Sequence, residues 1–357
     1  MLLSIYAGVI TLISFVNLIR LDHWWIRIWD FPHVQLATLA GLGLLGWLCN
    51  GLPVADGYWL VPTGLLLSLL YQSWLIFPYT PLHRRQVLRA RRNRQTSPAD
   101  QEQNTLSLMV ANVYMENTRC PDLNALVRKH RPDVLLVLEG NARWQGALSG
   151  LEADYPHRVL RPLENTYGLL FYSKLPLDGP RILCRVQADI PSLHTRLQLR
   201  SGQWVHFYGV HPMPPSPTEH YRSTERDAEL MLVGREVSRL TEPVLVAGDL
   251  NDVAWSHTTR LFQRISGLLD PRIGRGLFST FHAQYVFLRW PLDHVFVSRH
   301  FRLRLLRRLP NCGSDHFPIL VRLVYAPRLV TPGEQPQPED DDLLEADDTI
   351  RRAGVAP

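Results

Sequence analysis

The sequence predicts an α/β domain that follows three membrane-spanning helices. Two features indicate this arrangement: long uncharged apolar runs near the start of the chain, and short apolar runs between residues 105 and 325 that end in polar side chains. The chain has 357 residues, 46% of them hydrophobic, which is sufficient for both parts. Its four cysteines are scattered without a CxxC pair, so neither a disulfide framework nor a structural zinc site is indicated.

Three apolar runs predict a membrane domain in residues 1–81. They occupy residues 2–19, 34–49 with their flanks, and 58–78, and each is close to the ~18 residues that a spanning helix requires. Tryptophan and tyrosine lie near their ends, as is typical of membrane interfaces. Three buried helices of a soluble domain are the alternative. Charged residues are absent from the runs and cluster between them, which favours the membrane.

Charges in the connections predict the orientation. Arg20 and Arg27 lie between the first two runs, and an arginine-rich segment, residues 84–94, follows the third. Three spans place these regions on the same side, so the positive-inside rule predicts an integral protein of the bacterial inner-membrane type with a cytoplasmic domain. A patch for anionic lipid or nucleic acid is the alternative reading of the arginines. The net charge of +5 does not decide between them.

Composition predicts two further segments. Residues 82–104 read as a basic and polar linker, and residues 326–357, rich in proline and acid, read as a disordered tail. The remaining residues 105–325 suit a single α/β domain. We expect deletion of residues 1–94 to release this domain in soluble form.

Within residues 105–325, apolar runs predict strands, and helices are expected at residues 121–130 and 219–240. The seven predicted strands lie in residues 106–112, 134–140, 167–173, 204–211, 244–251, 292–298 and 317–323. Polar side chains stand at the edges of most of them. One polar strand end is an ordinary turn, but the recurrence predicts a shared site on one rim of a sheet. These residues are Asn112, Glu139, His211, Asp249, Asn251, Asp293, Ser314, Asp315 and His316.

The residue types in this set indicate a chemistry. Carboxylates with an amide and no thiolate suit a hard cation such as Mg²⁺ or Mn²⁺. Two histidines add hydrogen bonds or protons for an oxyanion. Together they suit hydrolysis of a phosphate ester, in which an aspartate orients water for in-line attack. The sequence contains neither a Walker-type phosphate loop nor a GxSxG elbow, so nucleotide-driven transfer and serine hydrolysis are disfavoured.

The order of the motifs resembles the endonuclease/exonuclease/phosphatase superfamily, which has the deoxyribonuclease I-like fold. The resemblance covers residues 105–324 and includes GVH at 209–211, GDLN at 248–251, LDHVFVS at 292–298 and GSDHFP at 313–318. The segment GLLDPRIGRG is similar to a bacterial subgroup, the YafD-like proteins, some of which carry N-terminal membrane helices. The resemblance implies a four-layer sandwich of two β-sheets flanked by helices, with the site at the sheet rims.

The resemblance also implies roles for the metal-binding residues. Glu139 would be the principal ligand of Mg²⁺ or Mn²⁺. Asn112 would lie beside it and contact metal or phosphate, and Asp315 would be a second ligand.

For catalysis the resemblance implies a further set. Asp249 would orient or deprotonate the attacking water, and Asn251 would hold the phosphate. His316 would contact a phosphoryl oxygen, with Asp293 accepting its other ring hydrogen. His211 would be a phosphate contact or an acid for the leaving oxygen.

The substrate stays open between a phospholipid, an inositol phosphate and a nucleic acid. Tyr114 stands where abasic-site nucleases of the superfamily have an acid, which weakens a DNA-repair role. A basic groove through Arg143, Arg158, Arg161 and Arg222 would favour nucleic acid, whereas an apolar rim would favour lipid. Two other hypotheses are a catalytically silent membrane scaffold and a nuclease that its helices merely localise.

Overall fold

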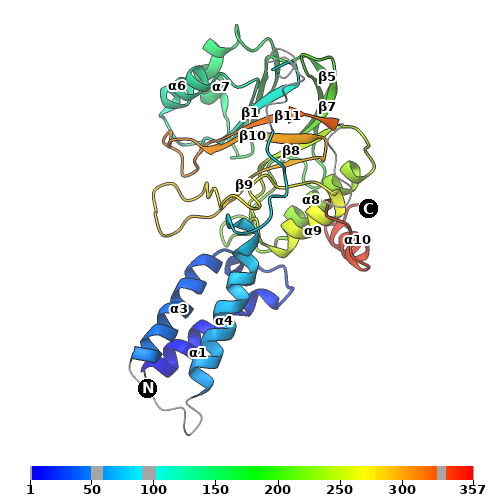
Figure 1. Ribbon diagram of the computed structural model, residues 1–357. Helices are drawn as coiled ribbons and strands as arrows, with labels where there is room; N and C mark the ends of the chain where they lie inside the picture. The colour runs from blue at the N-terminus through cyan, green and yellow to red at the C-terminus, as the bar shows by residue number, and fades with distance from the viewer. Residues whose placement is uncertain (1, 50–58, 91–101, 328–334, 357) are drawn as a thin grey trace.

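The computed structural model describes residues 2–49, 59–90, 102–327 and 335–356. An elongated helical bundle formed by the first part of the chain joins a larger body that holds the described strands (Figure 1). Tyr79, just after the last long helix of the bundle, donates a hydrogen bond of 2.6 Å to the carbonyl of Ala254 in the body.

Three helices form the bundle: α1 (Leu2–Ser14), α3 (His33–Cys49) and α4 (Leu60–Ile76). Apolar side chains from all three pack along its axis, among them Ile10, Leu36 and Leu65. Gly43 permits the close approach, because a Cβ atom there would lie 2.7 Å from the ring of Tyr6. Short helical turns connect the bundle to the body, namely η1 (Val16–Leu18), α2 (Trp24–Arg27), η2 (Ile28–Asp30) and η3 (Phe77–Tyr79).

Only one described helix reaches membrane-spanning length by itself, so the prediction of three spanning helices is wrong in number. That helix is Leu60–Tyr79, with 20 residues. The second predicted run forms α3, which meets the preceding Trp24–Asp30 at a bend of 68° because Pro32 begins a new helix. The first run forms a shorter apolar helix, Leu2–Leu18. Length and composition alone support at most two spans, counting the bent pair as one.

The body contains two mixed β-sheets. The six-stranded sheet has the order β10-β11-β1-β2-β4-β3, with β1 and β2 parallel and the other pairs antiparallel. Its strands are β1 (Thr105–Asn112), β2 (Val134–Leu138), β3 (His157–Arg161), β4 (Leu169–Ser173), β10 (Phe301–Arg308) and β11 (Ile319–Tyr325).

The second sheet is five-stranded and has the order β5-β6-β7-β8-β9, with β7 and β8 as its parallel pair. Its strands are β5 (Leu177–Leu183), β6 (Ser192–Gln198), β7 (Trp204–Val210), β8 (Val244–Asp249) and β9 (Asp293–Val297). The seven predicted strands are confirmed as β1, β2, β4, β7, β8, β9 and β11. The others were not predicted.

The two sheets pack face to face, and helices cover their outer faces. The central core combines side chains of both sheets, and the rings of Phe171 on β4 and Phe207 on β7 lie 5.0 Å apart across it. Helices α6 (Cys120–His130) and α7 (Ala142–Leu148), continued by η4 (Ser149–Leu151), cover the first sheet; α8 (Thr224–Ser238) and α9 (His257–Ser266) cover the second. This architecture confirms the expected sandwich, and α6 confirms the helix expected at residues 121–130.

The acidic tail is not disordered throughout, contrary to the sequence analysis. Residues Asp342–Arg352 form helix α10, which packs against α8 and α9. Ala346 and Ile350 are fully buried, and Arg264 on α9 forms a bidentate ion pair with Asp342. Two apolar side chains one turn apart therefore fix a segment whose overall composition resembles that of a disordered chain.

The expected linker, residues 82–104, is described only in part, because residues 91–101 lie outside the described residues. Its first part packs on the body: Val87 is fully buried, and the backbone of Leu88 and Ala90 pairs with Leu303 on β10 at 2.8 to 2.9 Å. This part therefore extends the first sheet at its β10 edge.

Candidate active site

The parallel strand pairs bring the polar strand ends together. β1 and β2 end at the same edge of one sheet, and β7 and β8 end at the same edge of the other, because parallel neighbours run in one direction. β9 starts at that edge, where Asp293 pairs in register with Asp249. The resulting cavity measures about 340 Å³. Six of the predicted residues line it, namely Glu139, His211, Asp249, Asn251, Asp315 and His316.

Asn112 and Asp293 are buried behind the residues that line the cavity, and they fix those residues by hydrogen bonds. The side-chain amide of Asn112 donates to Glu139 Oε1 at 2.8 Å and to Asp249 Oδ2 at 3.0 Å, which links the two sheets. Its oxygen accepts a hydrogen bond from the backbone N–H of Tyr114 at 3.1 Å. The backbone N–H of Met115 donates to the other oxygen of Glu139 at 3.2 Å. In this arrangement Asn112 acts as a donor between two carboxylates.

The backbone at the strand ends adopts left-handed conformations. The backbone φ angle is 60° at Glu139 and 51° at Asn251, in the left-handed region that residues other than glycine rarely adopt. Glycine is required at position 248, just before Asp249, because a Cβ atom there would lie 1.8 Å from the carbonyl oxygen of Val210. Asn251 is held by two hydrogen bonds of 2.9 Å, from its N–H to Asp249 Oδ1 and from its side chain to the Pro212 carbonyl. Such strained positions are common at functional sites.

His316 and Asp293 form a buried dyad beside Asp249. His316 Nδ1 lies 2.8 Å from Asp293 Oδ2, and its Nε2 lies 3.5 Å from Asp249 Oδ2. Burial opposes the charge on His316, but the two carboxylates outweigh it and raise its pKa to about 10. The ring is therefore an imidazolium at neutral pH. The second oxygen of Asp293 is buried and has no hydrogen-bond partner.

His211 directly follows β7, is buried, and differs from His316 in charge. Burial lowers its pKa to about 4, so the ring is neutral at neutral pH. Its Nδ1 has no hydrogen-bond partner, and its ring lies 5.5 Å from that of Tyr167. A neutral imidazole suits a phosphate contact better than the alternative role as an acid.

The donor set fits a divalent cation. Burial raises the pKa of Glu139 to about 7, and a cation beside it would stabilise the ionised form. Ligand atoms of Asp249, Asp293 and His316 also lie within 4.8 Å of one another, which makes this group a potential metal site. Its members differ from the predicted ligands Glu139, Asn112 and Asp315. Because His316 Nδ1 is engaged with Asp293, the atoms that suit Mg²⁺ here are carboxylate oxygens.

Sequence reasoning missed part of the cavity wall. Tyr167 lines it and donates a hydrogen bond of 2.6 Å to Glu219 in the proline-rich loop. Phe31 reaches it from the connection between α1 and α3, far away in the sequence, and no local pattern signals that approach. The other residues of the wall are Tyr114, Thr166, Pro214, Pro215, Glu219, Phe281 and Leu292.

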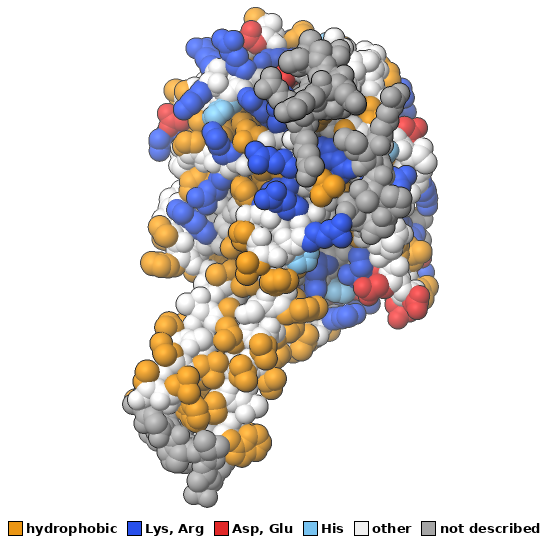
Figure 2. Space-filling model, viewed as in Figure 1, with side chains coloured by type: hydrophobic (Ala, Val, Ile, Leu, Met, Phe, Trp, Pro, Cys, Tyr) orange, Lys and Arg blue, Asp and Glu red, His pale blue; other side chains and the backbone are white. Residues whose placement is uncertain are grey.

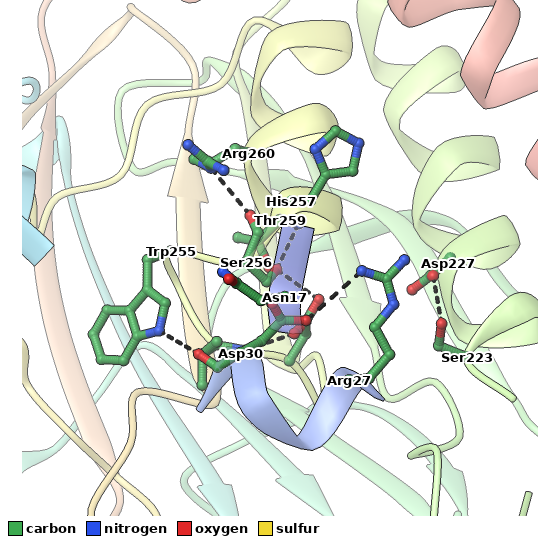
Figure 3. Close-up of polar contacts among 12 residues, drawn as sticks. Asn17, Arg27, Asp30, Ser223, Asp227, Trp255, Ser256, His257, Thr259 and Arg260 are labelled. Carbon is green, nitrogen blue, oxygen red and sulfur yellow. Dashed lines mark hydrogen bonds and ion pairs between the residues drawn. The ribbon is translucent and has the colours of Figure 1, made fainter. Parts of the chain in front are cut away.

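A buried charge network supports the Asn251 turn from behind. Arg226 on α8 donates to the carbonyl of Asn251 at 2.8 Å and forms ion pairs with Asp227 at 2.8 Å and Asp252 at 3.2 Å. The network reaches the N-terminal part of the chain, where Trp255 donates to the backbone carbonyl of Asp30 at 2.7 Å (Figure 3). In the same view, Asp30 pairs with Arg27 and Ser223 donates to Asp227.

The fold and this site define the class of protein. Residues 109–316 match the model of the Endonuclease/Exonuclease/phosphatase family. This match covers more than half of the chain, and the chain belongs to that family.

Individual relatives are distant. A UPF0294 protein of Vibrio cholerae is 25% identical over 293 residues, which cover 74% of this chain and 97% of the relative. D. rerio TDP2, solved in complex with a single-strand DNA product, is 17% identical with a TM-score of 0.51, covering 61% of this chain and 98% of the other. The human Nocturnin catalytic domain with bound sulfate is 15% identical with a TM-score of 0.50, covering 62% and 95%. These structural likenesses concern the fold alone.

Proposed function

We propose that this protein is a membrane-anchored, divalent-metal-dependent phosphoesterase. The observation that carries the proposal is the convergence of Glu139, Asp249 and the His316–Asp293 dyad in one cavity. A buried carboxylate, a water-orienting aspartate and a fixed imidazolium are the groups that hydrolysis of a phosphate ester requires.

Carboxylates of the cavity are assigned to metal binding and to activation of water. Glu139 and Asp315, with an oxygen of Asp249 or Asp293, would hold Mg²⁺ or Mn²⁺, which neutralises charge on phosphoryl oxygens when bound. Asp249 orients the attacking water and accepts its proton.

The remaining groups contact the phosphate. The imidazolium of His316, fixed by Asp293, donates to a phosphoryl oxygen and stabilises the charge that develops there. Asn251 and neutral His211 supply further hydrogen bonds.

The membrane anchor is supported by the outer surface of the bundle. Leucines of α1, α3 and α4 point outward and are more than half exposed, for example Leu12, Leu42 and Leu70, and Figure 2 shows hydrophobic side chains along the described bundle. Because a water-facing surface of this kind is unfavourable, we assign it to lipid. The arginines near residues 20–27 and 84–94 support a cytoplasmic body by the positive-inside rule.

A nuclease is the second candidate, favoured by the complex of D. rerio TDP2 with a single-strand DNA product. Three of the four arginines proposed for a basic groove contact other protein groups, which argues against it. Arg143 and Arg158 donate to backbone carbonyls, and Arg222 lies 3.6 Å from Asp22. No arginine is among the described residues that line the cavity.

The proposal is tested with the full-length chain in detergent and the soluble ester bis(p-nitrophenyl) phosphate. Hydrolysis should stop with EDTA and return with Mg²⁺ or Mn²⁺. Glu139→Gln should lower turnover about 100-fold or more, whereas Glu152→Gln, a surface acid paired with Arg158, should not change it. Asp249→Asn should lower kcat more than it raises KM. Metal-independent turnover, or full activity in Glu139→Gln, would leave only the silent scaffold or a different chemistry.

A further inference from the structure

A hairpin with an exposed apolar tip projects from the rim of the active site. Its two arms pair through Phe281 and Trp290, with a hydrogen bond of 3.0 Å from Phe281 N–H to the Trp290 carbonyl. Four consecutive apolar residues form the tip, and Phe287 is 86% exposed. Large apolar side chains are rarely grouped on a surface that faces water. The tip consists of Tyr285, Val286, Phe287 and Leu288.

The base of the hairpin belongs to the active site. Phe281 lines the cavity, and its ring lies 4.9 Å from that of His316. The N–H of Ala283 donates to the carbonyl of Asp315 at 2.6 Å. The tip is therefore only a few residues away from the loop that carries the catalytic histidine.

The tip also contacts the helical bundle. The side chain of Gln35, in the first turn of α3, donates a hydrogen bond of 2.7 Å to the carbonyl of Phe287. Phe31, just before α3, packs edge to face on Trp290 at 5.6 Å. The hairpin tip therefore lies next to the body-side end of the bundle (Figure 1).

Other exposed apolar side chains occur at this end of the bundle. Tryptophan is enriched at the membrane interface, where its ring is half in lipid and its N–H reaches water. Such residues near the body-side helix ends are Trp25, Ile28, Trp74, Phe77 and Leu82, each 45% to 86% exposed. A bilayer around the bundle would cover these residues and the hairpin tip together.

The geometry points to a lipid substrate: the Tyr285–Leu288 tip inserts into the head-group region of the bilayer, and the adjoining cavity hydrolyses a phosphate ester carried by a membrane lipid. The substrate part of this inference rests on the proposed function. The apolar tip favours a lipid over a nucleic acid, since Val286 and Leu288 offer no stacking surface and no arginine or lysine lies in the tip to bind a phosphate backbone. Phe31 and Phe281 supply apolar walls that suit the part of a lipid nearest to its phosphate.

Membrane contact is tested independently of catalysis. The full chain, with Cys49→Ser and Cys184→Ser to remove the exposed thiols, carries a fluorophore on Phe287→Cys or, as control, on Ala125→Cys, an exposed position of α6 at the end of the body away from the bundle (Figure 1). After reconstitution into phospholipid vesicles with brominated acyl chains, the dye at position 287 should be quenched and the dye at position 125 should not. Equal quenching at both positions, or none at 287, would overturn the membrane contact.

The substrate is tested by comparing two esters. Full-length protein in vesicles of phosphatidylethanolamine, phosphatidylglycerol and cardiolipin should release product from lipid, and Phe287→Ser should lower that rate at least about 10-fold. Hydrolysis of bis(p-nitrophenyl) phosphate should be unchanged in Phe287→Ser, and Ala125→Ser on the exposed side of α6 should affect neither rate.

The outcomes separate the two proposals. Hydrolysis of the soluble ester without hydrolysis of lipid, or a lipid rate that Phe287→Ser does not change, overturns the lipid substrate and leaves the phosphoesterase. Hydrolysis of neither ester, with quenching at position 287, removes the phosphoesterase while the membrane contact stands.

Discussion

At the scale of single residues, the molecule places ionisable groups where water cannot reach them. The imidazolium of His316 is stabilised because two carboxylates surround it. Behind Asp293, Arg272 forms a bidentate ion pair with Asp270 and lies 2.6 Å from His294. A buried charge with a partner is tolerated, whereas a buried carboxyl without one changes its pKa.

Glu229 on α8 is a buried carboxyl for which Ser192 and Arg185 do not offset the cost of burial, and its substitution by glutamine should remove a pH dependence of stability. It is buried, its Oε1 has no hydrogen-bond partner, and burial raises its pKa from 4.5 to about 7. The folded state thus binds a proton that the unfolded state releases near pH 4.5. Stability should fall as the pH rises from about 4.5 to about 7 and stay reduced above that range.

Glu229→Gln should therefore raise the free energy of unfolding by about 3 kcal/mol at pH 8 and leave it unchanged at pH 4. Urea unfolding of the full chain in detergent, followed by tryptophan fluorescence at both pH values, measures this. The surface variant Glu152→Gln serves as the control. An equal effect of Glu229→Gln at both pH values would show that the carboxyl is not protonated in the folded state.

At the scale of elements, the segment from β8 to α9 connects the cavity of the candidate active site to the buried charge network around Arg226. Leu250, Val253 and Trp255 are buried, and Ser256 caps α9 by accepting a hydrogen bond of 3.0 Å from Thr259 N–H. Asp252 faces away from the cavity toward Arg226. Asp249 and Asn251 of this segment thus line the cavity, while the residues between and after them pack into the interior.

Arg226→Met should unfold the protein more easily, because it leaves Asp227 and Asp252 buried without a counter-charge. The expected loss is about 3 to 5 kcal/mol in the free energy of unfolding. Arg235→Met on the same helix removes a partly exposed pair with Asp347 and should cost about 1 kcal/mol or less. Denaturant titrations of both variants measure the free energies of unfolding. Equal losses would show that the buried network stabilises the fold no more than the partly exposed pair does.

At the scale of the whole molecule, the bundle and the body form one packed unit. The backbone of Pro78 accepts a hydrogen bond of 2.8 Å from Gly274, and Trp255 contacts the rings of His33 and Tyr79. Val87 belongs to the core between the sheets. The body therefore includes residues that precede residue 105, the predicted start of the domain.

These contacts change the expectation that residues 95–357 form an independent soluble domain. A fragment from residue 95 exposes Trp255 and lacks Val87, so it should aggregate or unfold at a lower temperature than the full chain. A fragment from residue 80 keeps Val87 and the pairing with β10, and it should be the more stable of the two. Size-exclusion chromatography and thermal unfolding compare them. A monomeric 95–357 fragment as stable as the full chain would contradict the structure.

Much of the fold and the site could be predicted from local patterns. Alternating and continuous apolar runs indicate β1, β2, β4 and β7 to β9, because buried strands of a sandwich are rich in branched apolar residues. β3 and β5 escaped prediction because they lie at sheet edges and carry exposed polar side chains. α10 escaped because two buried residues in an acidic segment give a weak signal.

The sequence by itself determined which side chains stand at strand ends, and hence the chemistry of the site. Asn112, Glu139, Asp249 and His316 follow or precede their strands whatever the packing. Tertiary structure decided what lies around them: Phe31 in the cavity wall, Arg226 beneath Asn251, and the apolar hairpin against Gln35. These contacts join residues far apart in the chain. Local periodicity records the burial of a side chain but not its partner, so only the folded molecule reveals them.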